Sequence, residues 1–214
     1  MSEHIRNNEI VRDTESYAPK SKPRVIEMIQ AQLARQQLNT GTIGGETPYI
    51  LDLPELQVIG WENSDEAGTP YSDLWSHVFG EFDIDARFDS IPSKVQGSGC
   101  YLGIFQQQVS VPPLWEASAW DTGFMLAVEV ESGGCIPKGL IKQTFASSKY
   151  AIFIARGIPD QAFQTTCKLI KEQWLPSSEY RFNPDGVFFI NYTEKSGPSD
   201  ERFEAHLCVP VVRK

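Results

Sequence analysis

A carboxylate and an imidazole stand two residues apart near the C-terminus, at Glu204 and His206. Apolar and polar residues alternate through 202–211, which predicts a β-strand. Residues i and i+2 of a strand point to the same face, roughly 7 Å apart between Cα atoms, so the two side chains would lie side by side. Such a pair could favour a bound cation or act as an acid and a base. Other interpretations stay open for both residues. Glu204 faces solvent on such a strand in one of them, and His206 is then either an interior polar residue or an exposed one.

Aromatic side chains form a second group of candidates, because rings stack on flat or cationic molecules. Trp115 and Trp120 stand in a predicted loop, and aromatic residues on a loop beside a rigid sheet are reasonable ligand contacts. Trp75 follows Tyr71 on a predicted helix, where it serves either as core or as the wall of a pocket. The sequence leaves both interpretations of Trp75 open.

Composition and charge argue against several classes of function. The 214 residues carry a formal net charge of −9, and phosphate binding needs clustered Lys and Arg, so we expect no direct DNA binding and no attachment to membranes. The four cysteines show no C-x-x-C spacing and the three histidines are scattered, so we expect no metal site and no cofactor. The start of the sequence lacks a signal-peptide pattern and no apolar run has the length of a membrane span, which indicates the cytoplasm.

The apolar periodicity predicts an α+β fold with a mainly antiparallel sheet and helices packed on it. Helices are expected at about 22–38, at 70–82 and along the stripe of Phe163, Cys167, Ile170 and Trp174, which ends at Pro176. Strands are expected at 56–61, 100–108, 124–131, 149–155, 187–193 and 202–211, with a loop rich in Asp, Ser and Gly before residue 100. Each half therefore reads strand, helix, strand, strand, which indicates two repeats at about 53–131 and 140–212. Residues 1–48 would form an N-terminal extension with the first helix, and residues 49–214 the main domain.

Two further patterns predict the surroundings of single side chains. Cys167 and Cys208 lie inside apolar-periodic stretches, where a buried free thiol is the common outcome. Glu129 and Glu131 alternate with apolar residues, which is typical of a half-exposed strand with its carboxylates in solvent.

Four stretches of the sequence resemble the GyrI-like family, named for DNA gyrase inhibitory protein: LPELQVIGWENSDEAGTPYSDLW, SSKYAIFIARG, EQWLPSS and CVPV. The likeness covers roughly residues 50–214, and KYAIFIARG with EQWLP is its specific part. The resemblance implies two strand–helix–strand–strand repeats related by a pseudo-twofold axis, with a ligand cavity between them. Members of the family serve as effector-binding domains of AraC-like and MerR-like transcription activators, as free-standing binders of drugs or toxins, and in some cases as hydrolases.

The sequence departs from this family at two positions that are acidic in many relatives, where it has His206 and Phe188. The family's binders of lipophilic cations use rings around a buried carboxylate. Glu204 shares a predicted face with His206 and is the replacement carboxylate that we consider. The predicted ligand-binding residues are Tyr71, Trp75, Phe105, Trp115, Trp120, Phe188, Glu204 and His206.

The leading hypothesis is a free-standing protein that reversibly binds a small apolar or aromatic molecule, with a lipophilic cation as one form of that ligand. A first alternative is a hydrolase of strained or electrophilic molecules on the same fold, for which Glu204 and His206 are the only candidate pair. A second alternative is an interaction protein with a vestigial cavity, whose N-terminal helix docks a partner or a second copy. Whether the chain forms a homodimer stays open.

Overall fold

The computed structural model describes residues 24–40, 47–62, 83–95, 101–105, 124–131, 135–193 and 202–214. The predicted helix at 70–82 lies outside these residues. None of the helices in the described part of the chain has the length and apolar character that crossing a bilayer requires.

Nine strands of the described residues form one sheet in which every pair of neighbours is antiparallel. They are β1 (Tyr49–Leu53), β2 (Leu56–Glu62), β3 (Tyr101–Phe105), β4 (Phe124–Glu129), β5 (Ile141–Phe145), β6 (Ser148–Arg156), β7 (Tyr180–Phe182), β8 (Phe188–Tyr192) and β9 (Glu204–Arg213). The order across the sheet is β1-β6-β9-β8-β3-β4-β2-β5, with β7 paired to the end of β9.

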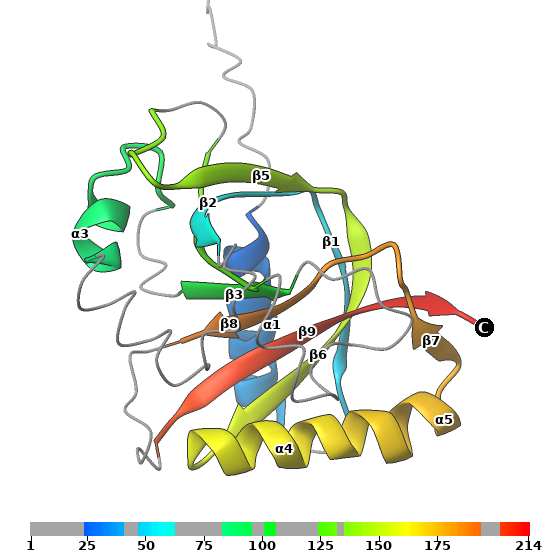
Figure 1. Cartoon of the computed structure of the whole chain (residues 1–214). Helices are drawn as coiled ribbons and strands as arrows, with labels where there is room; N and C mark the ends of the chain where they lie inside the picture. The colour runs from blue at the N-terminus through cyan, green and yellow to red at the C-terminus, as the bar shows by residue number, and fades with distance from the viewer. Residues whose placement is uncertain are drawn as a thin grey trace, which may run out of the picture.

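The strand order is symmetric about the β3–β8 pair at the centre of the sheet (Figure 1). Outward from this pair lie β8-β9-β6-β1 on one side and β3-β4-β2-β5 on the other. The outermost strand on each side comes from the other half of the chain, because β1 pairs with β6 and β5 pairs with β2. The two related halves predicted from the order of elements are therefore confirmed, and the exchanged edge strands tie them together.

Helix α1 (Val25–Thr40) packs on one face of the sheet with the stripe that its sequence predicts. The buried side chains of Val25, Ile26, Ile29 and Leu33 recur at the spacing of one helical face. The observed helix begins and ends within about three residues of the predicted bounds, which is ordinary for helix ends.

The longest helical stretch covers the other face and consists of α4 (Pro159–Leu169), a π-helical turn (Ile170–Trp174) and α5 (Leu175–Ser177). Pro159 suits the first turn because the backbone N–H that it lacks has no helical partner there. The helix ends at Ser177, beyond the predicted stop at Pro176. The Lys214 ammonium donates to the carbonyl oxygens of Leu175 (3.1 Å) and Ser178 (2.8 Å), which satisfies acceptors that a helix end leaves free.

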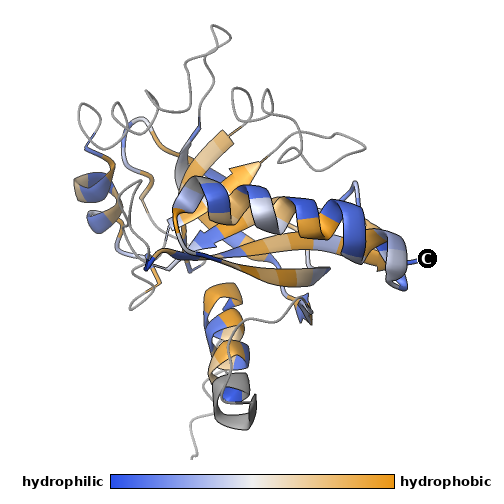
Figure 2. Ribbon diagram, turned by 90° about the horizontal axis from the view of Figure 1, so that it is seen from below, coloured by the Kyte–Doolittle hydropathy of each residue, from blue (hydrophilic) through white to orange (hydrophobic). Residues whose placement is uncertain are grey.

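Alternate residues of each strand point to opposite faces of the sheet. On the α4 face, Phe153 and Leu207 share a core with Ile170 of the long helix. On the α1 face, Ile152 shares a second core with Ile29 of α1. Figure 2 shows the two helices on opposite sides of a largely hydrophobic sheet.

Four elements of the structure differ from the sequence-based expectation. One is strand β1, which precedes the first expected strand. The predicted loop before residue 100 contains a short helix, α3 (Ile84–Asp89), because Ile84 and Phe88 are fully buried against the α4 face. Strand β5 is mostly exposed, so its sequence IKQTF lacks the apolar alternation of a half-buried strand. Strand β7 has only three residues, which is too short for a periodic signal.

Candidate ligand-binding site

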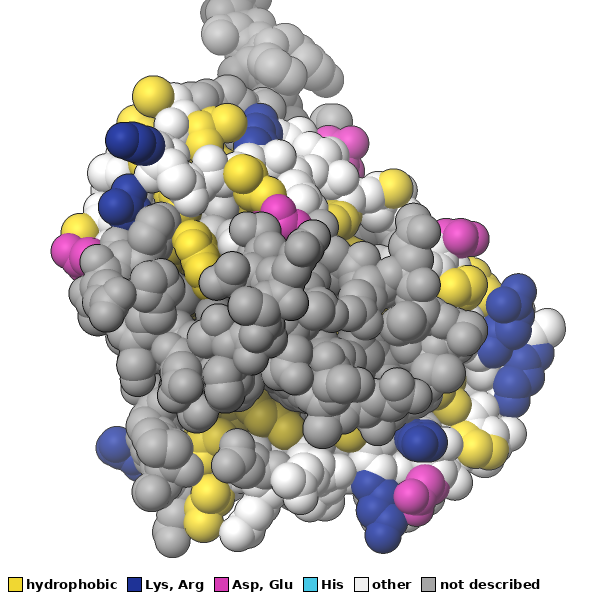
Figure 3. Space-filling view, in the orientation of Figure 1, with side chains coloured by type: hydrophobic (Ala, Val, Ile, Leu, Met, Phe, Trp, Pro, Cys, Tyr) yellow, Lys and Arg dark blue, Asp and Glu magenta, His cyan; other side chains and the backbone are white. Residues whose placement is uncertain are grey.

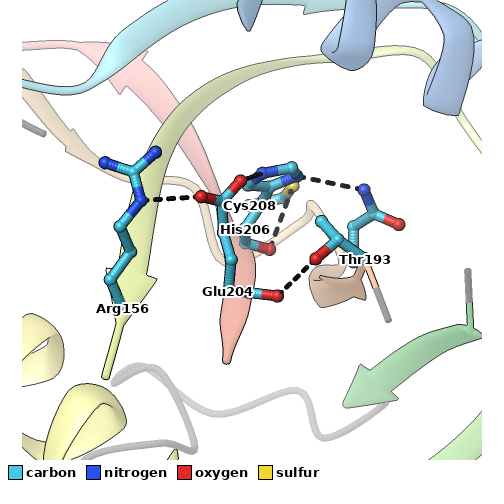
Figure 4. A network of polar contacts seen from close by, with 6 residues as sticks. Arg156, Thr193, Glu204, His206 and Cys208 are labelled. Carbon is cyan, nitrogen blue, oxygen red and sulfur yellow. Dashed lines mark hydrogen bonds and ion pairs between the residues drawn. The ribbon is translucent and has the colours of Figure 1, made fainter. Parts of the chain in front are cut away.

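A chain of polar side chains crosses three neighbouring strands on the α1 face of the sheet (Figure 4). The Arg156 guanidinium donates from Nε to Glu204 Oε2 at 2.6 Å. Glu204 Oε1 lies 3.2 Å from Nε2 of His206, and Nδ1 of the same ring lies 3.1 Å from Nδ2 of Asn191. We call these four residues the polar chain.

The strand register brings the four residues together. Arg156 of β6 is the cross-strand partner of Glu204 on β9, and Asn191 of β8 is the partner of His206. Glu204 and His206 are two residues apart without an intervening bulge, so they share a face and contact each other. The contact predicted from the spacing of these two residues is therefore present.

The inner end of the polar chain is buried among apolar side chains. His206 has 1% and Asn191 0% of its surface exposed. The neighbour of Asn191 on the next strand is Leu102, and the residue two places beyond His206 on its own face is the buried Cys208. A buried polar group costs free energy unless it is hydrogen-bonded, so polar side chains in the middle of an apolar face need a specific explanation.

The outer end of the polar chain is charged and partly exposed. The hydrogen bond from His206 lowers the pKa of Glu204 to about 2, with further lowering from Arg156, while partial burial acts in the opposite direction. The carboxylate is therefore ionised and can only accept hydrogen bonds, which makes Nε2–H of His206 the donor. The positive charge of Arg156 offsets the negative charge of Glu204 at 2.6 Å. No uncompensated anion is left within these four residues.

The structure does not bring the predicted site residues to one place. Phe105 and Phe188 belong to the core on the α4 face, opposite Glu204 and His206, with 3% and 2% of their surfaces exposed. Their ring centroids lie 5.5 Å apart, and Phe105 also packs at 5.4 Å against Phe124. Both rings are therefore explained by core packing. The predicted contacts Tyr71, Trp75, Trp115 and Trp120 lie outside the described residues.

Two members of the polar chain, Arg156 and Asn191, were not predicted from the sequence. Asn191 interrupts the apolar run VFFINY, and a polar residue inside a buried strand is the signal that could have identified it. Arg156 carries no comparable signal, because its role depends on the register between β6 and β9.

The burial of Glu129 corrects the sequence-based expectation. The residue was predicted to face solvent but is only 4% exposed, and its carboxylate accepts hydrogen bonds from the backbone N–H groups of Val25 (2.8 Å) and Ile26 (3.1 Å). Burial raises the pKa of Glu129, while these two hydrogen bonds lower it. This buried carboxylate caps the N-terminus of α1 and seats the helix on the sheet.

Charged side chains, and the side-chain types that could bind a metal ion, are dispersed in the described part of the chain. On the face drawn in Figure 3, Lys and Arg side chains lie near the margins of the view, with Asp and Glu among them. Among the described residues, no cluster of three or more His, Cys, Asp or Glu side chains could hold a metal ion.

The fold is shared with solved structures of other proteins, as the sequence resemblance implies. No protein-family model and no curated protein matches the sequence. Among solved structures, a protein of Staphylococcus aureus MU50 named as a transcription regulation protein has a TM-score of 0.50 at 20% identity, over 78% of this chain and 99% of that one. SAV2435 bound to tetraphenylphosphonium has a TM-score of 0.51 at 20% identity, over 77% and 93%. The EcmrR C-terminal domain has a TM-score of 0.50 at 11% identity, over 78% and 97%. At these identities the likeness establishes the fold.

Proposed function

We propose that this protein reversibly binds a small, largely apolar or aromatic molecule on the α1 face of the sheet, beside the polar chain. The observation that carries the proposal is the burial of Asn191 and His206 among the apolar side chains of this face. Ligand sites combine apolar walls with a few fixed polar groups that orient the bound molecule. Such a site would act as the receptor for an effector, as in the regulators that share the fold.

The described contacts of His206 favour binding over hydrolysis. A general base needs a nitrogen or oxygen that can reach the proton it removes. Nε2 of His206 faces Glu204 and Nδ1 faces Asn191, while Glu204 is also paired with Arg156. The only pair considered for the hydrolase alternative is therefore engaged in internal hydrogen bonds.

A lipophilic cation is one candidate ligand, since SAV2435 is described as bound to tetraphenylphosphonium. In this chain the ion pair with Arg156 balances the charge of Glu204. Affinity for such a cation would then come mainly from its apolar surface, at roughly 25 cal/mol per Å² removed from water. Neutral aromatic molecules of the same area should bind about as well.

Isothermal titration calorimetry with tetraphenylphosphonium and with the neutral aromatic 2-naphthol tests the proposal. We expect saturable binding with a Kd on the order of 1 μM to 100 μM, which corresponds to about −8 to −5 kcal/mol. Ile141→Ser is the matched control for non-specific binding. Ile141 is 37% exposed on the edge strand β5, where a probe could bind to any exposed apolar side chain. Binding should survive in Ile141→Ser. If neither probe nor a chemically broader panel binds, the proposal is wrong and the interaction-protein alternative replaces it.

A further inference from the structure

The side-chain oxygen of Asn191 is a buried hydrogen-bond acceptor that has no partner among the residues the structure describes. Asn191 has no exposed surface, and its Nδ2 faces His206 Nδ1 at 3.1 Å. Oδ1 of the same amide has no hydrogen-bond partner in the described part of the chain. Its cross-strand neighbour on β3 is Leu102, whose side chain has no donor to offer.

The polar chain fixes which way this amide points. The ionised Glu204 only accepts, so His206 uses Nε2–H to donate to it. The amide nitrogen of Asn191 can only donate, so Nδ1 of His206, which lies 3.1 Å from it, is the acceptor. Turning the amide over would bring Oδ1 against the lone pair of Nδ1. The ion pair with Arg156 at the outer end therefore holds Oδ1 at the inner end in an unpaired position.

An unpaired buried acceptor lowers stability, because the carbonyl has lost its water without gaining a partner. A bound molecule with an N–H or O–H group would remove that cost by donating to Oδ1. Discrimination of this kind is strong, because a ligand without the donor leaves the protein's acceptor unpaired.

We propose that Asn191 Oδ1 selects for ligands that carry a hydrogen-bond donor, so that the ligand class is neutral aromatic molecules with one O–H or N–H group. This inference rests on the proposed function and narrows it. The balanced charges of Arg156 and Glu204 fit the same class, since no negative charge remains to prefer a permanent cation.

The test compares 2-naphthol with 2-methoxynaphthalene, which has the same rings and no donor. We expect the wild-type protein to bind 2-naphthol about tenfold more tightly in calorimetry, which equals about 1.4 kcal/mol. In Asn191→Leu, the ratio should fall to within about twofold, because the acceptor is gone while the apolar surface is kept. Thr193→Val is the control, since Thr193 lies two residues along the same face and its hydroxyl donates to the Glu204 carbonyl at 2.7 Å. It should keep the tenfold ratio.

The outcomes separate this inference from the proposed function. Equal affinity of the wild-type protein for both probes overturns the role of Asn191 and leaves ligand binding intact. Failure of both probes and of tetraphenylphosphonium to bind contradicts the proposed function itself. The wild-type comparison does not depend on the folding of Asn191→Leu. A crystal structure with 2-naphthol in which a water molecule, rather than the ligand hydroxyl, donates to Oδ1 would also overturn the inference.

Discussion

The carboxylate of Glu129 on β4 accepts a hydrogen bond of 2.8 Å from the backbone N–H of Val25 at the start of α1. These two residues are 104 positions apart in the sequence. The contact fixes the N-terminal helix on the α1 face, which is the face that carries Asn191 and His206. The hydrogen bond that holds α1 on the sheet therefore lies on the same face as the proposed site.

Glu129→Gln should loosen α1 without disturbing the sheet. The amide oxygen can still accept one backbone N–H, but the NH₂ group cannot accept the second, and we expect a cost of about 1–2 kcal/mol in the docking of α1. Hydrogen–deuterium exchange of α1 amides measures this cost. Glu131→Gln is the matched control, because Glu131 pairs with Arg24 beside the same helix but is exposed. Unchanged exchange of α1 in Glu129→Gln would show that the carboxylate does not hold the helix.

Glu204 should contribute to stability in a defined range of acid pH. Its pKa is lowered from 4.5 to about 2, first by the hydrogen bond from His206. A lowered folded-state pKa gives stabilisation that is present above pH 4.5 and is lost as the pH falls toward 2. Urea unfolding across this range should therefore show a shallower loss of stability in Glu204→Gln than in the wild-type protein. Glu172→Gln, an exposed change on the long helix, should follow the wild-type slope. Identical slopes for all three proteins would contradict the ion-pair account.

The thiols should differ widely in reactivity toward a disulfide reagent at neutral pH. Burial raises the pKa of Cys167 to about 12 and that of Cys208 well above its ordinary value, whereas Cys135 is exposed. In a Cys100→Ser background, Cys135 should react first and the two buried thiols only after local opening. Peptide mass spectrometry identifies which thiol has reacted.

Cys208 also reports on α1, because it belongs to the core that includes this helix, whereas Cys167 lies on the α4 face. Glu129→Gln should speed the labelling of Cys208 more than that of Cys167. An equal increase at both thiols would indicate global destabilisation and would count against selective release of α1.

Much of the fold follows from local sequence, because most strands are buried on at least one face and α1 and the long helix have a clear apolar stripe. The long helix was predicted from Phe163, Cys167, Ile170 and Trp174, and all four contact the core. Strand β5 was missed because its exposed side chains do not alternate in polarity. Helix α3 was missed because its six residues present too little of a repeat.

The site was predictable only where its members are close in sequence. Glu204 and His206 were paired through the period of the strand, but Arg156 and Asn191 join them through the register of β6, β9 and β8. The register between strands that are far apart in the chain cannot be read directly from a single sequence. The solvent-facing prediction for Glu129 was wrong for the same reason, since α1 covers this residue from far away in the chain.

Isoleucine-methyl NMR during a titration with 2-naphthol tests the central claim most directly, because isoleucines mark both faces of the sheet. Ile104, Ile152 and Ile154 lie with the α1 core, whereas Ile59 and Ile190 lie with the α4 core. We predict saturable shifts of the first three methyl signals, with Ile59 and Ile190 little changed. Saturable shifts confined to Ile59 and Ile190 would place the ligand beside Phe105 and Phe188 instead, and would contradict binding at the α1 face.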